Sequence, residues 1–466
     1  MSKYSVVHSS SLFRSMVFLA APVLVEETLT LMVGWTDWWL TGHFLEDASP
    51  KAAMSLMAYM MWLIPSMFSA IAIGATAMVS RFIGGGDNRF ANHCANQAVT
   101  LGLILAAAGT FLIYFYHVEF IKLMNLPGDA AGYAVQYIQV VTWVIPLIMI
   151  EQVAAACLRG AGDTVSGLVA KTVVNVINIV VSTGLITGWG PFPNMGFVGL
   201  AIGTAAGHAV GGLILLTVLV VGRAGLRLSL VDLKPDGHVI RRLLKVGLPG
   251  GADIGAILIC QFIFVRIIYQ LGVIPAAAHG LAIEIEALAY LPGTAFQVAA
   301  ATMSGQFLGA GDSRRAVRSV FLCCASSGVV MTTAALVMFF GGGTLTHFFT
   351  GDSDPETARI ATELLKIIAL GIPSLSLAQV ISGALRGAGD TRWPLAITLI
   401  GFLVVRIPLA IVLTAAAREF NILEWPSIGF GYGVHGAWYA MVADIVVRSI
   451  LLIARLLHGG WLRIKV

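Results

Sequence analysis

The amino-acid sequence predicts an all-α polytopic membrane protein, with twelve transmembrane helices in two six-helix lobes related by an internal parallel repeat. Hydrophobic residues make up 58% of the 466 residues and charged residues only 11%, whereas a soluble globular protein carries about 25% charged residues. Apolar runs of about twenty residues, long enough to cross the hydrocarbon core as helices, recur along the chain. The heptad LRGAGDT occurs at 158–164 and again at 385–391, which indicates an internal duplication.

Each expected span is an apolar run whose ends are defined to within a few residues. The first run, from Phe13 to Phe44, is too long for the apolar region of a cleavable signal peptide, so we expect it to remain as the first span. The twelve spans are expected at residues 14–42, 53–80, 93–116, 130–157, 166–188, 196–222, 242–270, 276–303, 317–340, 358–384, 393–416 and 433–456.

Lysine and arginine determine the expected orientation. If the spans alternate, most basic residues fall in loops on one side, and the opposite loops carry few of them together with several acids. By the positive-inside rule, we expect both termini to be cytoplasmic. A multi-pass protein of this kind is expected in the plasma membrane, which is the inner membrane of a bacterium.

The two halves of the chain align without a gap around the heptads. IPLIMIEQVAAACLRGAGDT (145–164) matches IPSLSLAQVISGALRGAGDT (372–391), and a basic connection at 222–247 separates the halves. An even number of spans lies between equivalent positions, so both copies face the same way, as parallel repeats do. We expect an N-terminal lobe over residues 1–230 and a C-terminal lobe over residues 231–466.

Each heptad ends the fourth span of its half and begins the fifth. Glycine suits the left-handed conformation that closes a helix, and Asp163 or Asp390 can cap the N–H groups of the next helix. Arg159 and Arg386 would anchor the turns at the cytoplasmic face. The heptads therefore indicate structural turns, and a role in gating is the alternative.

Twelve spans, the duplication and the paired heptads together resemble the multidrug and toxic compound extrusion (MATE) family. DWWLTG (37–42) is similar to the family's D-T-x-F-V-G pattern in the first span, GLAIEIEALAYLPGTAF (280–296) to its eighth span, and RIPLA (406–410) to its eleventh. The resemblance covers essentially the whole chain. It implies a secondary active antiporter that exports bulky amphipathic or cationic compounds by alternating access between two lobes. The alternative in the same superfamily is a flippase or exporter of a lipid-linked or polysaccharide precursor.

The resemblance is closer to the DinF-type branch of the family than to the NorM-type branch. NorM-type members place coupling carboxylates in spans 7 and 10, where this chain has Ile257 and Ser376. DinF-type members rely on the N-terminal lobe, although this chain lacks their second aspartate.

Two acids lie on one face of the first span. Asp37 follows Glu26 by eleven positions, so both carboxylates fall on nearly the same side of the helix. Intramembrane acids are costly and commonly functional. The resemblance implies that Asp37 is the main coupling carboxylate, and Glu26 is a second candidate. The alternative for Asp37 is a carboxylate that only forms hydrogen bonds within a packed lobe.

A polar stripe follows one face of the fifth span. Lys171, Asn175, Asn178 and Ser182 are spaced by four, three and four residues. The family commonly has an aspartate where this chain has Ser182, and a small neutral residue where it has Lys171. The resemblance implies that the stripe belongs to the ion-coupling site.

One carboxylate at this level favours protons over sodium. A sodium site needs several oxygen ligands, and an ammonium nearby opposes a bound cation, whereas a proton needs one tunable carboxylate. Transient sodium at Asp37 is the alternative. Lys171 has three interpretations: an ion pair with Glu151 or Glu26, participation in coupling, or extension toward the headgroups.

Candidate substrate contacts lie in both halves. Glu284 and Glu286 face different sides of the eighth span, and one of them is expected to attract a cationic substrate. Soft and aromatic side chains suit adaptable binding, which makes Met32, Trp35 and Met61 further candidates. Contact with lipid is the alternative for these three residues.

Other function classes find no support in the sequence. It contains no G-x4-G-K-[ST] phosphate loop and no H-E-x-x-H motif, and its five cysteines show no CxxC spacing. We therefore expect a non-enzyme without a resident metal or cofactor, for which H⁺ or Na⁺ is the coupling ion. The expected partners are small amphipathic or cationic substrates and the lipid bilayer, with no nucleic acid, and we expect a monomer.

Overall fold

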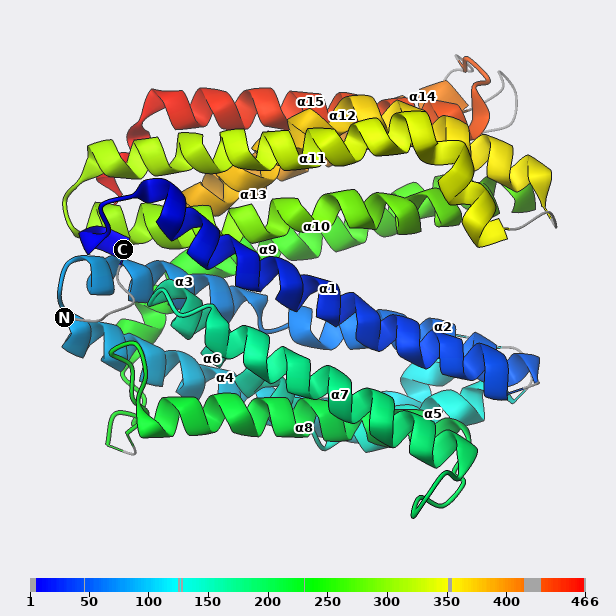
Figure 1. The fold of residues 1–466 in the computed structure, drawn as a ribbon, viewed down its shortest axis with the longest axis horizontal. Helices are drawn as coiled ribbons and strands as arrows, with labels where there is room; N and C mark the ends of the chain where they lie inside the picture. Colours follow the sequence, from blue (N-terminus) through cyan, green and yellow to red (C-terminus); the bar gives the residue numbers. More distant parts are fainter. Residues whose placement is uncertain are drawn as a thin grey trace. The chain divides into compact units, whose positions relative to one another are not determined.

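The computed structural model describes residues 6–45, 47–124, 126, 129–229, 231–350, 354–414 and 429–464. Throughout these residues the secondary structure is helical, and no strand is present among them (Figure 1). The predicted all-α fold class is confirmed. Packing divides the chain into two compact units.

Unit 1 extends through Gly251 and includes Gly305–Gly311. After a short 3-10 turn, η1 (Val6–His8), it contains α1 (Leu12–Phe44), α2 (Ala48–Ser66), α3 (Ser69–Gly84), α4 (Asn88–Leu123), α5 (Ala130–Thr142), α6 (Ile145–Gly160), α7 (Val165–Thr187) and α8 (Phe197–Val221).

Unit 2 contains Ala252–Ser304 and the chain from Asp312 onward. The expected division between residues 230 and 231 stays a prediction, and packing assigns the first turns of α9 to unit 1. The helices of this half are α9 (Gly237–Tyr269), α10 (Val273–Gly309), α11 (Ser313–Thr350), α12 (Pro355–Gly387), α13 (Arg392–Leu399), α14 (Ile407–Thr414), α15 (Gly433–His458) and the 3-10 turn η3 (Gly460–Arg463).

Ten helical segments of the described chain are long and apolar enough to cross a membrane, and the bent pair α5 and α6 makes an eleventh. The pair bends by 58° beside Pro146, which has no N–H to continue the helical hydrogen bonds. The twelfth expected span corresponds to α15, which buries Asp444 and falls outside that apolar set.

The fifth span of unit 2 is irregular. A π-helix, η2 (Ile400–Arg406), lies between α13 and α14. The equivalent fifth span of unit 1, α7, is an uninterrupted α-helix. A π turn adds a residue to the helical repeat, so the two equivalent spans differ in which side chains share a face.

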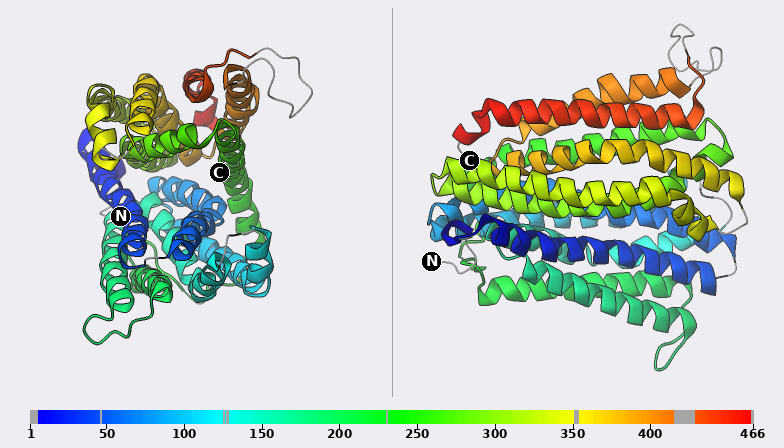
Figure 2. Two further views of the ribbon diagram at one scale, coloured as in Figure 1. Left: turned by 90° about the vertical axis from the view of Figure 1, so that its right-hand side faces the viewer. Right: turned by 45° about the horizontal axis from the view of Figure 1, so that its top comes forward.

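Helices α7 and α8 lie side by side in unit 1 (Figure 2). Glycines spaced by four residues form a stripe on α8. At each of these glycines, atoms of α7 occupy the position that a Cβ atom would take. The Cβ of an alanine at position 203 would lie 2.0 Å from Oγ of Ser182, and one at position 207 would lie 2.8 Å from the carbonyl oxygen of Val174. Small residues at such spacing let membrane helices approach closely. The stripe consists of Gly199, Gly203, Gly207 and Gly211.

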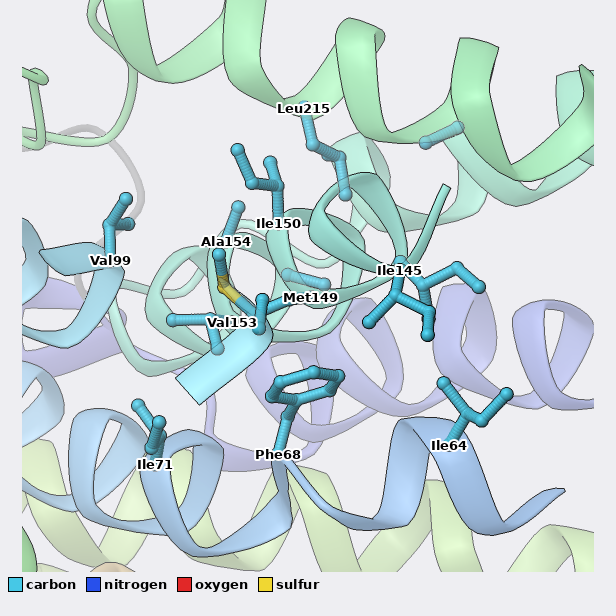
Figure 3. Close-up of a cluster of buried hydrophobic side chains, with 14 of the residues drawn as sticks. Ile64, Phe68, Ile71, Val99, Ile145, Met149, Ile150, Val153, Ala154 and Leu215 are labelled. Carbon is cyan, nitrogen blue, oxygen red and sulfur yellow. The ribbon is translucent and has the colours of Figure 1, made fainter. Parts of the chain in front are cut away.

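A hydrophobic cluster fills the interior of unit 1 around α6 (Figure 3). Met149 and Val153 of α6 are fully buried, together with Phe68 beside α3, Val99 of α4 and Leu215 of α8. This packing fixes α6 between its neighbours, so that polar side chains on α6 are held at defined positions.

Replacement of Gly203 by alanine should destabilise the protein, because the added methyl group collides with Ser182 and must separate α7 from α8. Overpacking of this kind costs about 1–3 kcal/mol. The thermal unfolding midpoint in detergent measures the effect. Gly132→Ala on α5 is the matched control, since no atom lies within 4 Å of its added Cβ. Equal midpoints for the two variants would contradict the close approach of α7 and α8.

Candidate functional site

Asp37 of α1 is 2% exposed and is surrounded by three other helices of unit 1. Its Oδ1 accepts a hydrogen bond from Nδ2 of Asn178 on α7 at 3.3 Å. Its Oδ2 accepts from Oγ1 of Thr204 on α8 at 2.7 Å and from the hydroxyl of Tyr137 on α5 at 3.5 Å. All three donors are uncharged, so these hydrogen bonds place no cation directly on Asp37.

Asn178 connects Asp37 with the rest of the polar stripe. Its Nδ2 also lies 3.1 Å from Oγ1 of Thr204 and 3.4 Å from Oγ of Ser182. Asn175 is one turn away and donates to the carbonyl oxygen of Lys171 at 3.0 Å. The side-chain oxygens of Asn175 and Asn178 are buried, and neither has a hydrogen-bond partner among the described residues.

Lys171 pairs with Glu151 of α6, which decides between the two acids that the sequence left open. Nζ of Lys171 donates to Oε1 of Glu151. The other oxygen, Oε2, lies 2.7 Å from Nδ1 of His208 on α8. All three side chains are buried, so α6, α7 and α8 enclose a connected set of ionisable groups.

Glu26 pairs with the arginine of the first heptad. Nη1 of Arg159 lies 3.0 Å from Oε1 of Glu26. The equivalent pair in unit 2 joins Arg386 to Asp253, 133 positions apart in both cases. The structure therefore places Glu26 in an ion pair repeated in both units and not in direct contact with Asp37.

The aspartate of each heptad binds an arginine after or near the end of the sixth span. Asp163 accepts from Nε of Arg223, and it also accepts from the backbone N–H of Ser166 at 3.1 Å. Asp390 accepts from Nε of Arg455 at 2.9 Å. Each heptad thus ties its turn to the first and the sixth spans of its own unit.

Unit 2 has a different buried cluster. Asp444 of α15 is bound by two guanidinium groups, from Arg406 at 2.9 Å and from Arg448 at 2.8 Å. Arg406 comes from the RIPLA segment at the end of the π-helix, and its guanidinium stacks 4.3 Å from the ring centre of Phe402. Asp444 is thus bound by two cations, whereas the hydrogen-bond donors of Asp37 are uncharged.

The structure separates the residues expected to contact substrate. Glu284 on α10 is exposed and Glu286 is half-buried. On α1, Met32 and Trp35 are about two-fifths exposed, at 40% and 43%, and Met61 on α2 is half-buried. Glu284 and Glu286 belong to unit 2 and the other three residues to unit 1, and the roles of all five stay predictions.

Sequence reasoning identified Asp37, Asn178 and Ser182, which the structure brings together. It missed Thr204, Tyr137 and His208, which come from other helices and complete the hydrogen bonds of the buried acids. Thr204 and His208 are polar residues in a very apolar helix, four positions apart. That spacing on α8 is the signal that could have found them.

The MatE family model matches residues 22–183 and 256–412, which together are more than half of the chain. The chain belongs to the MatE family. The first matched range contains Asp37 and the stripe of α7, whereas Thr204 and His208 lie between the two ranges.

Similar MatE proteins match along nearly the full length. The chain is 28% identical over 448 residues to the probable multidrug resistance protein NorM of Thermotoga maritima, covering 96% of this chain and 93% of that protein. It is 25% identical over 453 residues to the uncharacterized transporter YisQ of Bacillus subtilis, covering 96% and 95%. The family consists of membrane transporters, and this chain is a multi-span member of it.

Solved structures confirm the MatE fold. A transporter of the MOP superfamily from Pyrococcus furiosus, described as having a binding pocket of reverse polarity, superposes with a TM-score of 0.89 at 18% identity and covers 100% of both chains. A MATE family transporter in an outward-facing conformation gives a TM-score of 0.87 at 19% identity, with coverage of 98% and 99%.

Removal of the acid from either heptad pair should destabilise the protein to a similar extent. Glu26→Gln removes the carboxylate that binds the half-buried Arg159, and Asp253→Asn removes the one that binds Arg386. The loss of one partner of a buried pair costs about 3–5 kcal/mol. Thermal unfolding of purified protein measures both variants.

The control for this prediction is Arg359→Gln, which breaks an exposed pair with Glu363 and should change stability by no more than about 1 kcal/mol. A destabilisation by Glu26→Gln no greater than that of the control would show that the repeated ion pair does not hold the unit together.

Proposed function

We propose that this MatE protein is a secondary active antiporter that exports bulky amphipathic or cationic compounds, with Asp37 as the main coupling carboxylate. The observation that carries the proposal is the neutral hydrogen-bonding environment of Asp37. Hydroxyl and amide groups can donate to a carboxylate or accept from a protonated carboxyl group. Thr204, Tyr137 and Asn178 can therefore satisfy Asp37 in either charge state.

Protons are the proposed coupling ion, and sodium is the alternative. The pairing of Lys171 with Glu151 weakens the electrostatic opposition to a cation that the sequence suggested. The remaining argument is the number of carboxylates, because Asp37 is the one acid in the hydrogen-bonded group with Asn178, Ser182 and Thr204. Sodium prefers several oxygen ligands that include carboxylate, and the buried oxygens of Asn175 and Asn178 would have to supply them.

Alternating access requires that the two conformations bind the ion with different affinity. A protonated Asp37 is neutral and can stay buried in a lobe without water, whereas the ionised carboxylate needs hydrogen-bond donors or water. One cation that enters through about 100 mV releases about 2.3 kcal/mol, and one pH unit adds about 1.4 kcal/mol. One proton per cycle could then sustain roughly a 500-fold gradient of a neutral substrate.

Further parts of the proposal come from sequence and from relatives. The name of the Thermotoga maritima relative favours drug-like substrates, and the loop charges favour cytoplasmic termini in an inner membrane. The closer resemblance to the DinF-type branch is also part of this proposal, because Ile257 and Ser376 stand where NorM-type members have coupling carboxylates. We further propose that the protein acts as a monomer.

The test is efflux of ethidium from proteoliposomes that contain the full chain, under an imposed pH gradient or an imposed sodium gradient. The pH gradient alone should drive efflux, and Asp37→Asn should reduce the rate to that of protein-free vesicles, because the amide cannot exchange a proton. Asp312→Asn, at the N-terminal cap of α11, is the matched control and should retain efflux.

Three other outcomes would change the proposal. Efflux driven by sodium alone would replace protons by sodium. Full activity of Asp37→Asn would remove the coupling role of this carboxylate. No ethidium movement under either gradient would contradict drug export, and a lipid-linked precursor would be the next substrate to test.

A further inference from the structure

A second buried ionisable group in unit 1 has no role in the proposed function so far. Glu151 of α6 is 4% exposed, Lys171 of α7 is 6% exposed and His208 of α8 is 9% exposed. Glu151 uses one oxygen for Lys171 and the other for Nδ1 of His208, at 2.7 Å. We name these three residues the buried triad.

The charges of the triad are not those of a simple salt bridge. Lys171 already balances the charge of Glu151, so the hydrogen bond to His208 is not needed for neutrality. Histidine is the side chain that ordinarily changes charge near neutral pH. The bond to Glu151 uses Nδ1, which leaves Nε2 as the nitrogen that can gain a proton. Protonation of His208 would give the triad a net positive charge, with the imidazolium bound by the carboxylate of Glu151.

The triad and the hydrogen-bond donors of Asp37 share two helices, α7 and α8. On α8, His208 follows Thr204 by one turn, and the hydroxyl of Thr204 donates to Asp37 at 2.7 Å. On α7, Asn175 donates to the backbone carbonyl of Lys171, and Asn178, three residues further on, donates to Asp37. The glycine stripe of α8 keeps the two helices in close contact along this path.

We propose that His208 is a second proton-binding site, which exchanges a proton with Asp37 during the transport cycle. The inference rests on the proposed function, since it requires proton coupling through Asp37. The carboxyl group of Asp37 loses its proton and becomes a carboxylate, while Nε2 of His208 gains a proton and the imidazole becomes an imidazolium. The total charge of the lobe is unchanged, so the ionised Asp37 is matched by a buried cation.

Each member of the triad has a distinct part in this exchange. Glu151 holds the His208 ring by Nδ1 and stabilises the imidazolium. Lys171 keeps Glu151 ionised when His208 is neutral. The helices packed against α8 carry further titratable groups. They are Tyr133 and Tyr137 of α5, Cys157 and Arg159 of α6, and Arg14, Glu26, Glu27, Asp37 and His43 of α1. Glu26 pairs with Arg159.

The principal variant is His208→Asn. The amide nitrogen of asparagine can replace Nδ1 as a donor to Glu151, but the side chain cannot be protonated. Two readouts are needed in the same proteoliposomes: ethidium efflux driven by a pH gradient, and exchange of ethidium for ethidium without any gradient. Coupled efflux should fall at least tenfold, and exchange should be retained, because exchange needs substrate binding but no net proton transfer.

The matched control is His435→Asn in unit 2. His435 also pairs with a glutamate, Glu363, at 2.8 Å, but its side chain is 30% exposed. This variant should retain both coupled efflux and exchange. A loss of coupled efflux in His435→Asn equal to that in His208→Asn would overturn the assignment of a specific role to His208.

The outcomes separate the inference from the proposed function. If wild type shows pH-driven efflux and Asp37→Asn abolishes it, but His208→Asn keeps the wild-type rate and pH profile, the function stands and the second site is wrong. Loss of exchange together with efflux in a folded His208→Asn protein would show a structural role and would also overturn the inference. Absence of proton-driven efflux in wild type contradicts the proposed function itself.

A second measurement does not depend on the folding of the His208 variant. Nitrogen NMR of histidine-labelled protein in lipid follows the protonation of the ten histidines in wild type and in Asp37→Asn. Removal of the carboxylate should make one buried histidine harder to protonate, since the imidazolium loses its counter-charge. Identical titration of all histidine signals in the two proteins would contradict proton exchange between His208 and Asp37.

Discussion

The ion pair between the arginine of each heptad and an acid in the first span of its unit is the interaction on which the rest of the unit depends. Lipid offers no partner to a charge, so Glu26 and Arg159 must stay together once the helices are packed. The pair fixes α1 against the end of α6. That position sets the depth at which Asp37, eleven residues further along α1, reaches α7 and α8.

Close helix packing then determines which polar groups can meet. Glycine on α8 brings its backbone against α7, and Thr204 of α8 and Asn178 of α7 both donate to Asp37 of α1. A bulkier helix would leave the carboxylate without its donors. His208 of the same helix lies beside Glu151 of α6. Helix α8 thus contacts two chemically different sites: Asp37, whose hydrogen-bond donors are uncharged, and Glu151, which is bound by Lys171 and His208.

The sequence predicted the fold class and the polar stripe of α7, because hydropathy and helical periodicity are properties of single segments. It also placed Asp37 and Glu26 on one face of α1, but it could not show which helices that face contacts. It could not predict Thr204, Tyr137 or His208, because their importance comes from contacts between helices that are far apart in the chain. The choice of Glu151 over Glu26 for Lys171 was likewise a matter of packing, since both acids are compatible with the depth of the lysine.

The π-helix in the fifth span of unit 2 has a consequence for how the two copies could diverge. At the positions equivalent to Lys171, Asn175, Asn178 and Ser182, the second copy has Thr398, Phe402, Val405 and Leu409. The heptad turns form equivalent ion pairs in both copies, but the second fifth span lacks the asparagines of the first, contains a π-helix and buries Arg406 against Asp444. Mutations could therefore reshape the inside of one copy while the shared joints preserved its assembly. After the duplication, the two six-helix units thus share the same turns, while the side chains inside each unit can change independently.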